Sequence, residues 1–384
     1  MTDAVPVTVL TGFLGSGKTT LLNRLLKDPA LTDTAVIINE FGDVGIDHLL
    51  VEQSSDGVIE LSDGCLCCTV RGELIDTLSD LVDRQQTGRI KALKRIIIET
   101  TGLADPAPVL HAIMGHPVLM QNLHLDGVLV TVDAVNGMAT LDNHEEAIKQ
   151  AAVADRLVLT KGDIADDETV SLLAARLKAL NPGAPLLAAH ACETGHAALF
   201  NCGLYDPATK SLDVQRWLRD EAYAASDADH DHHEHGHDHG HDHHDHDEHH
   251  HHHDVNRHDA RVQAFTLTHD GLVEPATLEM FIDLLRSSHG DRLLRMKGIV
   301  GLTDRPESPV VVHGVQTIFH PPARLPAWPD PADRRTRLVV ITRDLDGSYV
   351  RDLFNAFVGR PSIDRADGRT LADNPLAVPG HSFS

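Results

Sequence analysis

The sequence predicts an α/β protein, with a larger domain built on a mostly parallel sheet and a smaller C-terminal domain of the α+β class. Two observations lead to this prediction. Up to about residue 205, short apolar runs alternate with helical patterns, as in sheets whose parallel strands are joined by helices. After a histidine-rich stretch, the patterns follow the order β-α-β-β-β-α from residue 262 to residue 357.

The chain of 384 residues is long enough for two domains with substantial cores. We expect the first domain to cover residues 1–205 and the second to cover residues 259–363. Residues 206–258 would form a linker that contains the histidine-rich tract, and residues 364–384 would form an irregular tail.

The composition narrows the function further. A net charge of −24, with histidine counted as neutral, argues against a basic surface for nucleic acid. Five cysteines, three of them between residues 65 and 68, favour a reducing compartment and a metal or redox site over a disulfide framework. No apolar run is as long as a membrane span, and the N-terminus lacks a signal region. We therefore expect a cytoplasmic protein without membrane or nucleic-acid partners.

A glycine-rich loop follows the first β-branched run, and a helical pattern over residues 21–26 follows the loop. Gly12, Gly17, Lys18 and Thr19 fit the P-loop motif G-x-x-x-x-G-K-[ST] in the strand-to-helix context that it requires. Backbone N–H groups of such a loop surround phosphate oxygens, the lysine reaches the β- and γ-phosphates, and the threonine hydroxyl ligates Mg²⁺. The residues predicted to bind the nucleotide here are Gly12, Phe13, Leu14, Gly15, Ser16, Gly17, Lys18, Thr19 and Thr20.

Further strands of the first domain are predicted at residues 35–38, 95–98, 127–132, 157–160 and 185–188. Open α/β sheets bind their ligands at the carboxyl ends of the strands. Chemistry-bearing residues at those ends are therefore the ones to look for.

The strand predicted at residues 95–98 leads to Glu99, and Gly102 follows three residues later. A carboxylate in this place can hold Mg²⁺ through water or orient an attacking water, and a glycine N–H can bond to the γ-phosphate. Many buried strands end in an acid that only caps a helix, so the P-loop upstream gives this pattern its weight. We predict catalytic roles for Lys18, Thr19 and Glu99, and nucleotide binding by Gly102.

The strand predicted at residues 157–160 runs into the sequence T-K-G-D, which indicates recognition of guanine. Guanine presents two donors on one edge, and a single carboxylate such as Asp163 can accept both. Lys161 would pack its aliphatic stem along the plane of the base. We therefore predict that Thr160, Lys161 and Asp163 bind the base, which favours GTP over ATP.

Three cysteines, Cys65, Cys67 and Cys68, lie between the P-loop and the strand that ends at Glu99. Thiolates are soft ligands that select Zn²⁺, Cu⁺ or related ions, and cysteines two residues apart can reach one ion from an extended loop. A redox switch and simple packing of small side chains are the alternatives. We predict a metal site at this loop.

Together these segments resemble the CobW-type family of P-loop GTPases, whose relatives include the GTPases that help to load nickel into hydrogenase and urease. The resemblance implies nucleotide binding at the parallel sheet, a metal at the C-x-C-C loop, and metal transfer to a client apo-protein gated by GTP hydrolysis. It is carried by residues 12–20 (GFLGSGKTT), 39–42 (NEFG), 64–68 (GCLCC), 99–106 (ETTGLADP) and 160–163 (TKGD) in the first domain, and by residues 294–298 (LRMKG) and 312–316 (VHGVQ) in the second.

One position departs from the family pattern. Some members carry an acid directly before the asparagine that corresponds to Asn39, as a further metal ligand, whereas this chain has Ile38 there. Asp43 and Glu40 are candidates for the non-cysteine ligand, and so is a water molecule.

The tract at residues 230–253 holds fifteen histidines interleaved with acidic residues and glycine. Such a segment cannot bury a core, and we expect it to be disordered without metal. A purification tag or a plain linker would be the alternatives, but tags are terminal and uniform, and a linker needs no histidine. Imidazole beside carboxylate suits Zn²⁺, Ni²⁺ or Co²⁺, so we predict metal buffering.

Arg295 and His313 are polar residues inside apolar runs of the second domain, and we expect a structural role for each. The domain has no catalytic constellation of its own, so contact with a client or partner is expected by family analogy alone.

The leading hypothesis is a GTP-hydrolysing metallochaperone that uses GTP, Mg²⁺ and Zn²⁺ and delivers zinc to a client apo-metalloprotein. Cobalt delivery towards cobalamin synthesis is the alternative within this class. A metal buffer with vestigial nucleotide binding and a P-loop kinase are alternatives from other classes. An intact P-loop with both Lys18 and Thr19 argues against the buffer.

Overall fold

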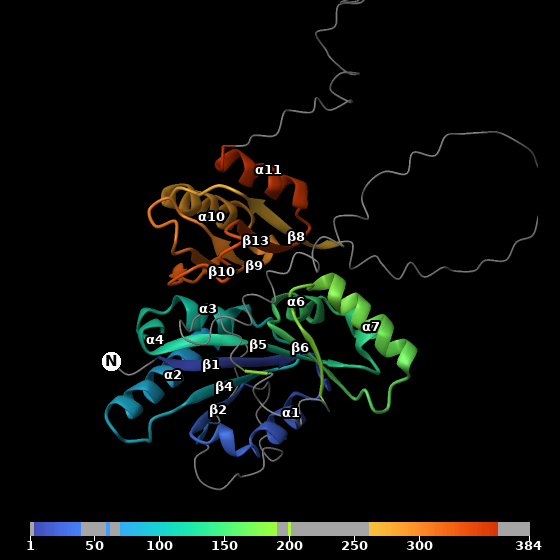
Figure 1. The fold of residues 1–384 in the computed structure, drawn as a ribbon. Coiled ribbons are helices and arrows are strands. Elements are labelled where there is room, and N and C mark those ends of the chain that lie inside the picture. Colours follow the sequence, from blue (N-terminus) through green and yellow to red (C-terminus); the bar gives the residue numbers. More distant parts are fainter. Residues whose placement is uncertain (1–3, 40–58, 62–69, 190–198, 201–260, 360–384) are drawn as a thin grey trace, which may run out of the picture.

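The computed structural model describes residues 4–39, 59–61, 70–189, 199–200 and 261–359. Their strands form two separate sheets, one in each half of the chain. Figure 1 shows the larger sheet below and the smaller sheet above, with helices α3 (Ala107–Gly115) and α6 (Glu145–Val153) between them. The α/β class with a smaller α+β domain, predicted from the sequence, is confirmed.

The larger sheet has seven strands in the described part of the chain, and every neighbouring pair runs parallel. Because the strands share one direction, their carboxyl ends meet at one edge, where Gly12 is paired with Thr131 and Asp133 with Thr160. In sheet order the strands are β3 (Ile59–Leu61), β2 (Thr34–Asn39), β4 (Arg95–Thr100), β1 (Val5–Gly12), β5 (Leu123–Asp133), β6 (Arg156–Thr160) and β7 (Leu186–Ala188).

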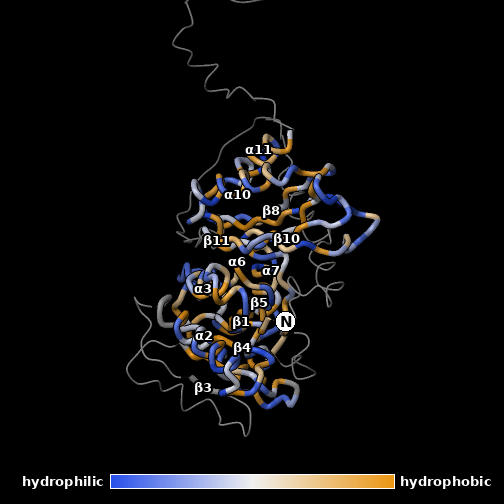
Figure 2. The backbone as a smooth tube through the Cα atoms, turned by 90° about the vertical axis from the view of Figure 1, so that its left-hand side faces the viewer, coloured by the Kyte–Doolittle hydropathy of each residue, from blue (hydrophilic) through white to orange (hydrophobic). Residues whose placement is uncertain are grey.

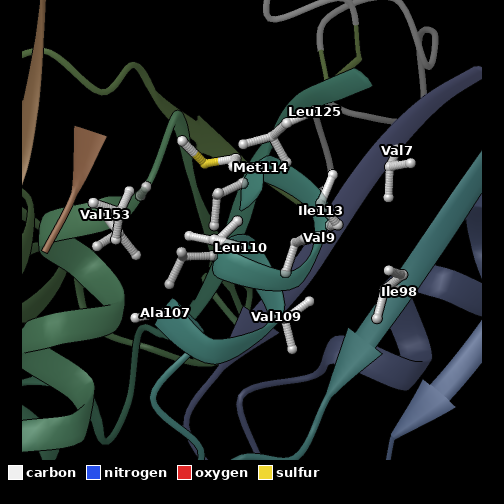
Figure 3. Close-up of a cluster of buried hydrophobic side chains, with 14 of the residues drawn as sticks. Val7, Val9, Ile98, Ala107, Val109, Leu110, Ile113, Met114, Leu125 and Val153 are labelled. Atoms are coloured by element: carbon white, nitrogen blue, oxygen red, sulfur yellow. The ribbon is translucent and has the colours of Figure 1, made fainter. Parts of the chain in front are cut away.

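Alternate side chains of these strands fill two cores, one on each face of the sheet. On one face, Val9 and Ile98 pack with Leu110 and Ile113 of α3, as Figure 3 shows. On the other face, Leu10 packs against α1, the helix that follows the glycine-rich loop. Helix α1 is Lys18–Leu25, and the helices that pack on the first face with α3 and α6 are α2 (Val70–Gln86), α4 (Pro117–Asn122), α5 (Gly137–Asn143) and α7 (Asp167–Leu180).

The smaller sheet pairs antiparallel, and two helices cover one of its faces. Phe281 of α10 and Phe354 of α11 meet edge to face, with ring centroids 5.3 Å apart, above the apolar side of the strands. The elements are β8 (Val262–His269), α10 (Pro275–His289), β9 (Leu293–Val300), β10 (Val310–Val315), β11 (Ile318–Phe319), β12 (Ala323–Arg324), β13 (Thr336–Arg343) and α11 (Gly347–Phe357), with a short 3₁₀ turn at Gly290–Arg292. In the larger domain, a similar turn at Pro29–Leu31 lies between α1 and β2.

The second face of the smaller sheet lies on the larger domain. Ala152 of α6 forms a small apolar cluster with Leu294 and Ile341 of the sheet, and the ring Nε2 of His111 is 2.9 Å from the carbonyl oxygen of Val315. Figure 2, turned by 90°, shows the two bodies stacked in the same way, with hydrophobic strands inside each.

Asp155 is the central charge of this interface. It is buried, its Oδ1 accepts a hydrogen bond from Lys297 at 2.7 Å, and it also pairs with Arg295, which donates to the carbonyl oxygen of Val153 as well. Burial by itself would raise the pKa of Asp155, but Arg295 and Lys297 outweigh it and hold that pKa well below its ordinary range. Arg295 and His313 are both buried here, in keeping with the structural role expected for them.

No helix in the ranges that the structure describes is both long and apolar enough to cross a membrane.

Candidate nucleotide site at the ends of the central strands

The glycine-rich loop between β1 and α1 has the backbone shape that its sequence predicts. Gly12, Gly15 and Gly17 have positive φ angles of 142°, 71° and 87°, a region that favours glycine. At Gly12 there is also no room, because a Cβ atom would lie 2.4 Å from the carbonyl oxygen of Thr131. Leu14, Gly15 and Thr20 are exposed on the loop and the helix start. The chain therefore presents loop N–H groups and a helix N-terminus together.

The loop is fastened to the neighbouring strands by hydroxyl groups. The Ser16 and Thr131 hydroxyl oxygens are 2.7 Å apart, and the Thr160 hydroxyl donates to the Ser16 carbonyl oxygen at 2.7 Å. A Cβ on Gly17 would lie 3.3 Å from Thr160. The loop predicted to bind phosphate thus touches the strand end predicted to bind the base.

Lys18 is buried, although its charge would ordinarily keep it in water. Its ammonium donates to the carbonyl oxygens of Gly12 at 3.1 Å and Phe13 at 3.3 Å. The ammonium is therefore held against the loop itself, at the N-terminal end of α1. A phosphate oxygen is a stronger partner for an ammonium than a carbonyl oxygen, because both groups of that pair are charged.

Thr19 and Glu99, predicted from two separate motifs, lie in direct contact. The Thr19 hydroxyl donates to Glu99 Oε1 at 2.8 Å, and Glu99 is only 1% exposed at the tip of β4. A hydroxyl and a carboxylate are the hard oxygen donors that Mg²⁺ prefers, so the chemistry of this pair would suit a magnesium ion.

The turn at residues 101–105, which we call the Gly102 turn, lies against the glycine-rich loop. A Cβ on Gly102 would be 2.6 Å from the backbone nitrogen of Leu14. Gln150 of α6, which is 1% exposed, donates to the carbonyl oxygens of Gly102 at 3.3 Å and Ala104 at 3.0 Å. The sequence motifs did not point to Gln150, because no local pattern links a helix residue to a turn 48 positions away.

The end of β6 carries the residues predicted to bind guanine. Lys161 has a positive φ of 56°, and its ammonium is 2.7 Å from Asp133 Oδ2. Asp163 is exposed in the turn that follows. The structure therefore brings Thr160 and Lys161 beside the glycine-rich loop and leaves the Asp163 carboxylate accessible.

Asp133, at the end of β5, is a site residue that the motifs missed. Burial would raise the pKa of its carboxyl, but hydrogen bonds from Lys161, Asn136 and the Val135 backbone lower it below its ordinary value. The signal was present in the sequence, because an acid directly after an apolar strand is followed three residues later by asparagine. Asp133 therefore anchors Lys161 as an ionised partner.

A cavity of about 240 Å³ lies between the glycine-rich loop and helices α5 and α6. Phe13 and Leu14 of the loop, Leu141 of α5 and Gln150 of α6 are among its walls. The Phe13 ring also stacks on His144, with centroids 4.3 Å apart. Asp133, Asn136 and Lys161 also line this cavity, whereas Lys18 does not. We therefore expect the phosphates at the N-terminus of α1, beside Lys18, rather than in this cavity.

Cys65, Cys67 and Cys68 lie outside the described residues, as do Asp43 and Glu40. Within the residues that are described, no three His, Cys, Asp or Glu side chains gather into a metal-binding group. The predicted metal loop and the histidine tract therefore remain predictions from the sequence.

Two family profiles match the chain, one on each domain. Residues 6–188 match the profile described as CobW/HypB/UreG, nucleotide-binding domain. Residues 262–358 match the profile described as cobalamin synthesis protein cobW C-terminal domain.

Similar proteins extend this finding. The chain is 40% identical over 199 residues to zinc chaperone YjiA of Escherichia coli, covering 52% of this chain and 62% of that protein. It is 36% identical over 186 residues to zinc-regulated GTPase metalloprotein activator 1 of Schizosaccharomyces pombe, covering 47% of this chain and 44% of that protein. The chain thus matches less than two thirds of the length of these curated relatives.

The crystal structure of Zn(II)-bound YjiA GTPase from Escherichia coli aligns with 92% of this chain and 99% of its own, with a TM-score of 0.63 and 27% identity. The likeness therefore extends over both domains. With the P-loop, the Thr19–Glu99 pair and both profiles in agreement, the chain belongs to the CobW-type family of P-loop GTPases.

Proposed function

We propose that this protein hydrolyses GTP and uses the hydrolysis to deliver zinc to a client apo-protein. The observation that supports it best is the meeting of Lys18, Thr19 and Glu99 at the carboxyl ends of β1 and β4, with the Gly102 turn beside them. This is the set of groups that phosphoryl transfer requires: a lysine, a magnesium-binding hydroxyl and carboxylate, and a backbone N–H near the γ-phosphate.

The phosphates would bind along the loop N–H groups, with Lys18 exchanging its two carbonyl partners for β- and γ-phosphate oxygens. Thr19 and Glu99 would hold Mg²⁺, which neutralises phosphate charge. Glu99, fixed by the Thr19 hydroxyl, would orient the attacking water. The Gly102 N–H would bond to the γ-phosphate and lose that bond after hydrolysis.

For the base we propose guanine. The exposed Asp163 carboxylate can accept both donors of its N1 edge, and Lys161 would flank the ring with its stem while Asp133 holds its ammonium. Thr160, bonded to the Ser16 carbonyl, sets the distance between the base and the phosphate loop.

For the metal we propose zinc at Cys65, Cys67 and Cys68, with Asp43 as a candidate oxygen ligand. The names of the similar proteins, zinc chaperone and zinc-regulated GTPase metalloprotein activator, support zinc as the cargo. The cysteine loop lies in the chain between the P-loop and β4, the interval in which nucleotide switches keep the segments that order around the γ-phosphate. GTP would thus order the thiolates, and hydrolysis would release the ion to a client.

We further propose that the histidine tract buffers metal ions and that the domain at residues 259–363 contacts the client. Residues 206–258 would then link it to the GTPase domain at residues 1–205. We also propose a cytoplasmic location, because a reducing compartment would keep the three cysteines of the metal loop available as thiolate ligands. Cobalt is the second candidate cargo, favoured by the cobalamin-synthesis description of the C-terminal profile.

The nucleotide half of this proposal is tested by phosphate release from GTP and from ATP. We expect turnover with GTP and loss of most turnover in Lys18→Ala. Lys27→Ala is the matched control, because it removes the same charge from an exposed residue just beyond α1. Equal hydrolysis of ATP and GTP by the parent would refute the preference for GTP. Turnover of Lys18→Ala equal to that of the parent would refute the P-loop assignment.

The metal half is tested by competition with a chromogenic zinc chelator, in GDP and in a non-hydrolysable GTP analogue with Mg²⁺. The variant without residues 229–254 is used, so that weak histidine sites do not hide the tight one. We expect zinc to bind about 5–150-fold tighter with the GTP analogue. Identical affinity in both nucleotides would leave a static zinc site and remove the gating. The same titration with Co²⁺ compares the two cargoes, and a pulldown of GTP-dependent partners under zinc limitation identifies the client.

A further inference from the structure

We propose that Gln150 is a positioning residue for GTP hydrolysis, which holds the Gly102 turn at the distance from the P-loop that γ-phosphate binding requires. This inference rests on the GTPase function proposed above. Gln150 lies on α6, outside every motif that identified the nucleotide site.

The hydrogen bonds of Gln150 are the first part of the argument. Its carboxamide nitrogen has two N–H donors, and the turn takes both: Gly102 O at 3.3 Å and Ala104 O at 3.0 Å. These carbonyls flank Leu103, so together they fix the direction of the turn. Gln150 is 1% exposed, and a buried carboxamide in such a bonded position is costly to replace with an apolar group.

The turn needs an external support. The backbone N–H groups at its centre bond only within the turn: Leu103 N donates to the Thr101 hydroxyl at 3.3 Å, and Ala104 N donates to the Thr101 carbonyl at 3.2 Å. At the end of the turn, Asp105 is held by Gln316 at 3.1 Å and by Lys149 at 3.5 Å. Leu103 itself is 50% exposed. Gln150 ties the carbonyls of Gly102 and Ala104 to α6, a helix that packs in the core, and so holds the centre of the turn beside the P-loop.

The Gly102 turn cannot move closer to the P-loop without a steric clash. A Cβ on Gly102 would come within 2.6 Å of Leu14 N and 2.8 Å of Leu14 Cα, so the turn and the P-loop backbone are already in contact. The Gly102 N–H reaches a γ-phosphate only if this spacing holds. Since GDP has no γ-phosphate, a displaced turn should weaken GTP binding and slow hydrolysis while leaving GDP binding as it was.

The first variant is Gln150→Met, which keeps the length of the side chain and removes both donors. We expect kcat to fall about tenfold, which corresponds to about 1.4 kcal/mol and lies within the range expected for the loss of two hydrogen bonds. We also expect the preference for a non-hydrolysable GTP analogue over GDP to fall by a similar factor. Affinity for GDP should not change.

The matched control is Asn181→Leu. Asn181 is a second buried carboxamide that holds α6, donating to the carbonyl oxygens of Ala151, Ala152 and Ala154 at 2.9–3.1 Å, at the C-terminal end of the helix. This variant should lower the stability of the protein as Gln150→Met does, because it too leaves buried carbonyl oxygens without a hydrogen-bond donor. It should leave kcat and the preference for the GTP analogue over GDP unchanged.

Gln150→Glu supplies a readout that a purely structural role would not move. A buried carboxyl has a raised pKa; when protonated it can donate to one carbonyl of the turn, and when ionised it repels both. Lys149, Asp105, Asp133 and Lys161 are the charged groups nearby. Turnover of this variant relative to the parent should therefore fall as the pH rises from 6 to 8, while the ratio for Gln150→Met stays flat.

The results separate this inference from the function on which it rests. If the parent protein does not hydrolyse GTP, the proposed function fails. If the parent hydrolyses GTP and Gln150→Met keeps both kcat and the nucleotide preference, the function stands and the role of Gln150 is refuted. A loss of GDP affinity equal to that of the GTP analogue, or the same losses in Asn181→Leu, would also refute it.

Discussion

The hydroxyl of Thr19 donates to the carboxylate of Glu99 across 80 positions of the sequence, at 2.8 Å. The contact follows from the sheet, because β1 and β4 are neighbours in register and Leu10 is paired with Glu99. Helix α1 follows β1 after the glycine-rich loop, and its first turn carries Thr19 to the tip of β4. Two motifs that were read separately therefore describe one site.

Glu99→Gln should slow hydrolysis at saturating GTP by at least about 100-fold, since the variant keeps the shape of the side chain and loses the charge that orients water. Binding of GDP without Mg²⁺ should be unchanged, because the loop N–H groups and Lys18 remain. Phosphate release and fluorescent-nucleotide titration measure the two quantities. Equal turnover in parent and variant would show that Glu99 only stabilises the strand end.

Asp163→Asn should weaken GTP and admit xanthosine triphosphate. The amide offers a donor where guanine also offers donors, whereas xanthine presents a carbonyl at that position. Asp163 is exposed and outside the core, so this change should leave the thermal midpoint unaltered. Competition titrations measure the affinity of parent and variant for both nucleotides. An unchanged affinity for GTP would show that Asp163 does not bind the base.

The parts of the site that could be predicted from the sequence are those that belong to short local motifs. The glycine positions, Lys18 and Glu99 each belong to a short strand-turn-helix pattern, and the parallel sheet brings such patterns to one edge. Asp133 was predictable in principle, since an acid ends the apolar run and Asn136 follows. The strands β3, β11 and β12 were missed, because two or three residues carry no recognisable alternation.

Gln150 and Asp155 could not be found in this way. Each acts through tertiary contacts, Gln150 on a turn 46 to 48 positions away and Asp155 on residues 140 and 142 positions away in the other domain. Nothing in the sequence around α6 distinguishes Gln150, inside the helix, or Asp155, just beyond it, from an ordinary polar residue. Their roles depend on how the smaller sheet and the Gly102 turn pack on that helix.

Asp155→Asn should lower the free energy of unfolding by about 3–5 kcal/mol, because it removes the carboxylate that pairs with the buried Arg295 and the half-buried Lys297. The matched control is Glu145→Gln at the start of α6, whose pairs with Arg261 and Arg343 are exposed and should contribute at most about 1 kcal/mol. Urea unfolding of parent and variants measures both.

The Asp155 carboxylate should also make the stability of the folded protein fall in strong acid. Because the folded pKa of Asp155 lies below its ordinary value of 3.8, its contribution is complete above that pH and is lost only as the pH falls towards the folded pKa. Equal effects of Asp155→Asn and Glu145→Gln would mean that the buried charges are solvated after all.

His313 should make the stability of the protein fall in mildly acidic solution. Burial first, and then the neighbouring Arg295 and Lys297, hold its pKa well below the ordinary value of 6.5, while Asp155 opposes them and His320 adds a small lowering. The folded state therefore keeps the ring neutral in a range where the unfolded chain binds a proton. Stability should rise with pH through the window between the folded pKa and 6.5, and fall as the pH drops below 6.5.

His313→Gln isolates this contribution, since the other histidines remain in both proteins. In the parent, the group can supply a slope of up to about 1.4 kcal/mol per pH unit below pH 6.5, and the variant should lack that part of the slope. Urea unfolding at several pH values between 5 and 7.5 measures the difference between the two curves. That difference should shrink as the pH falls, because the parent loses stability that the variant never had. Parallel curves would show that His313 is protonated equally in the folded and unfolded states and contributes only packing at the interface.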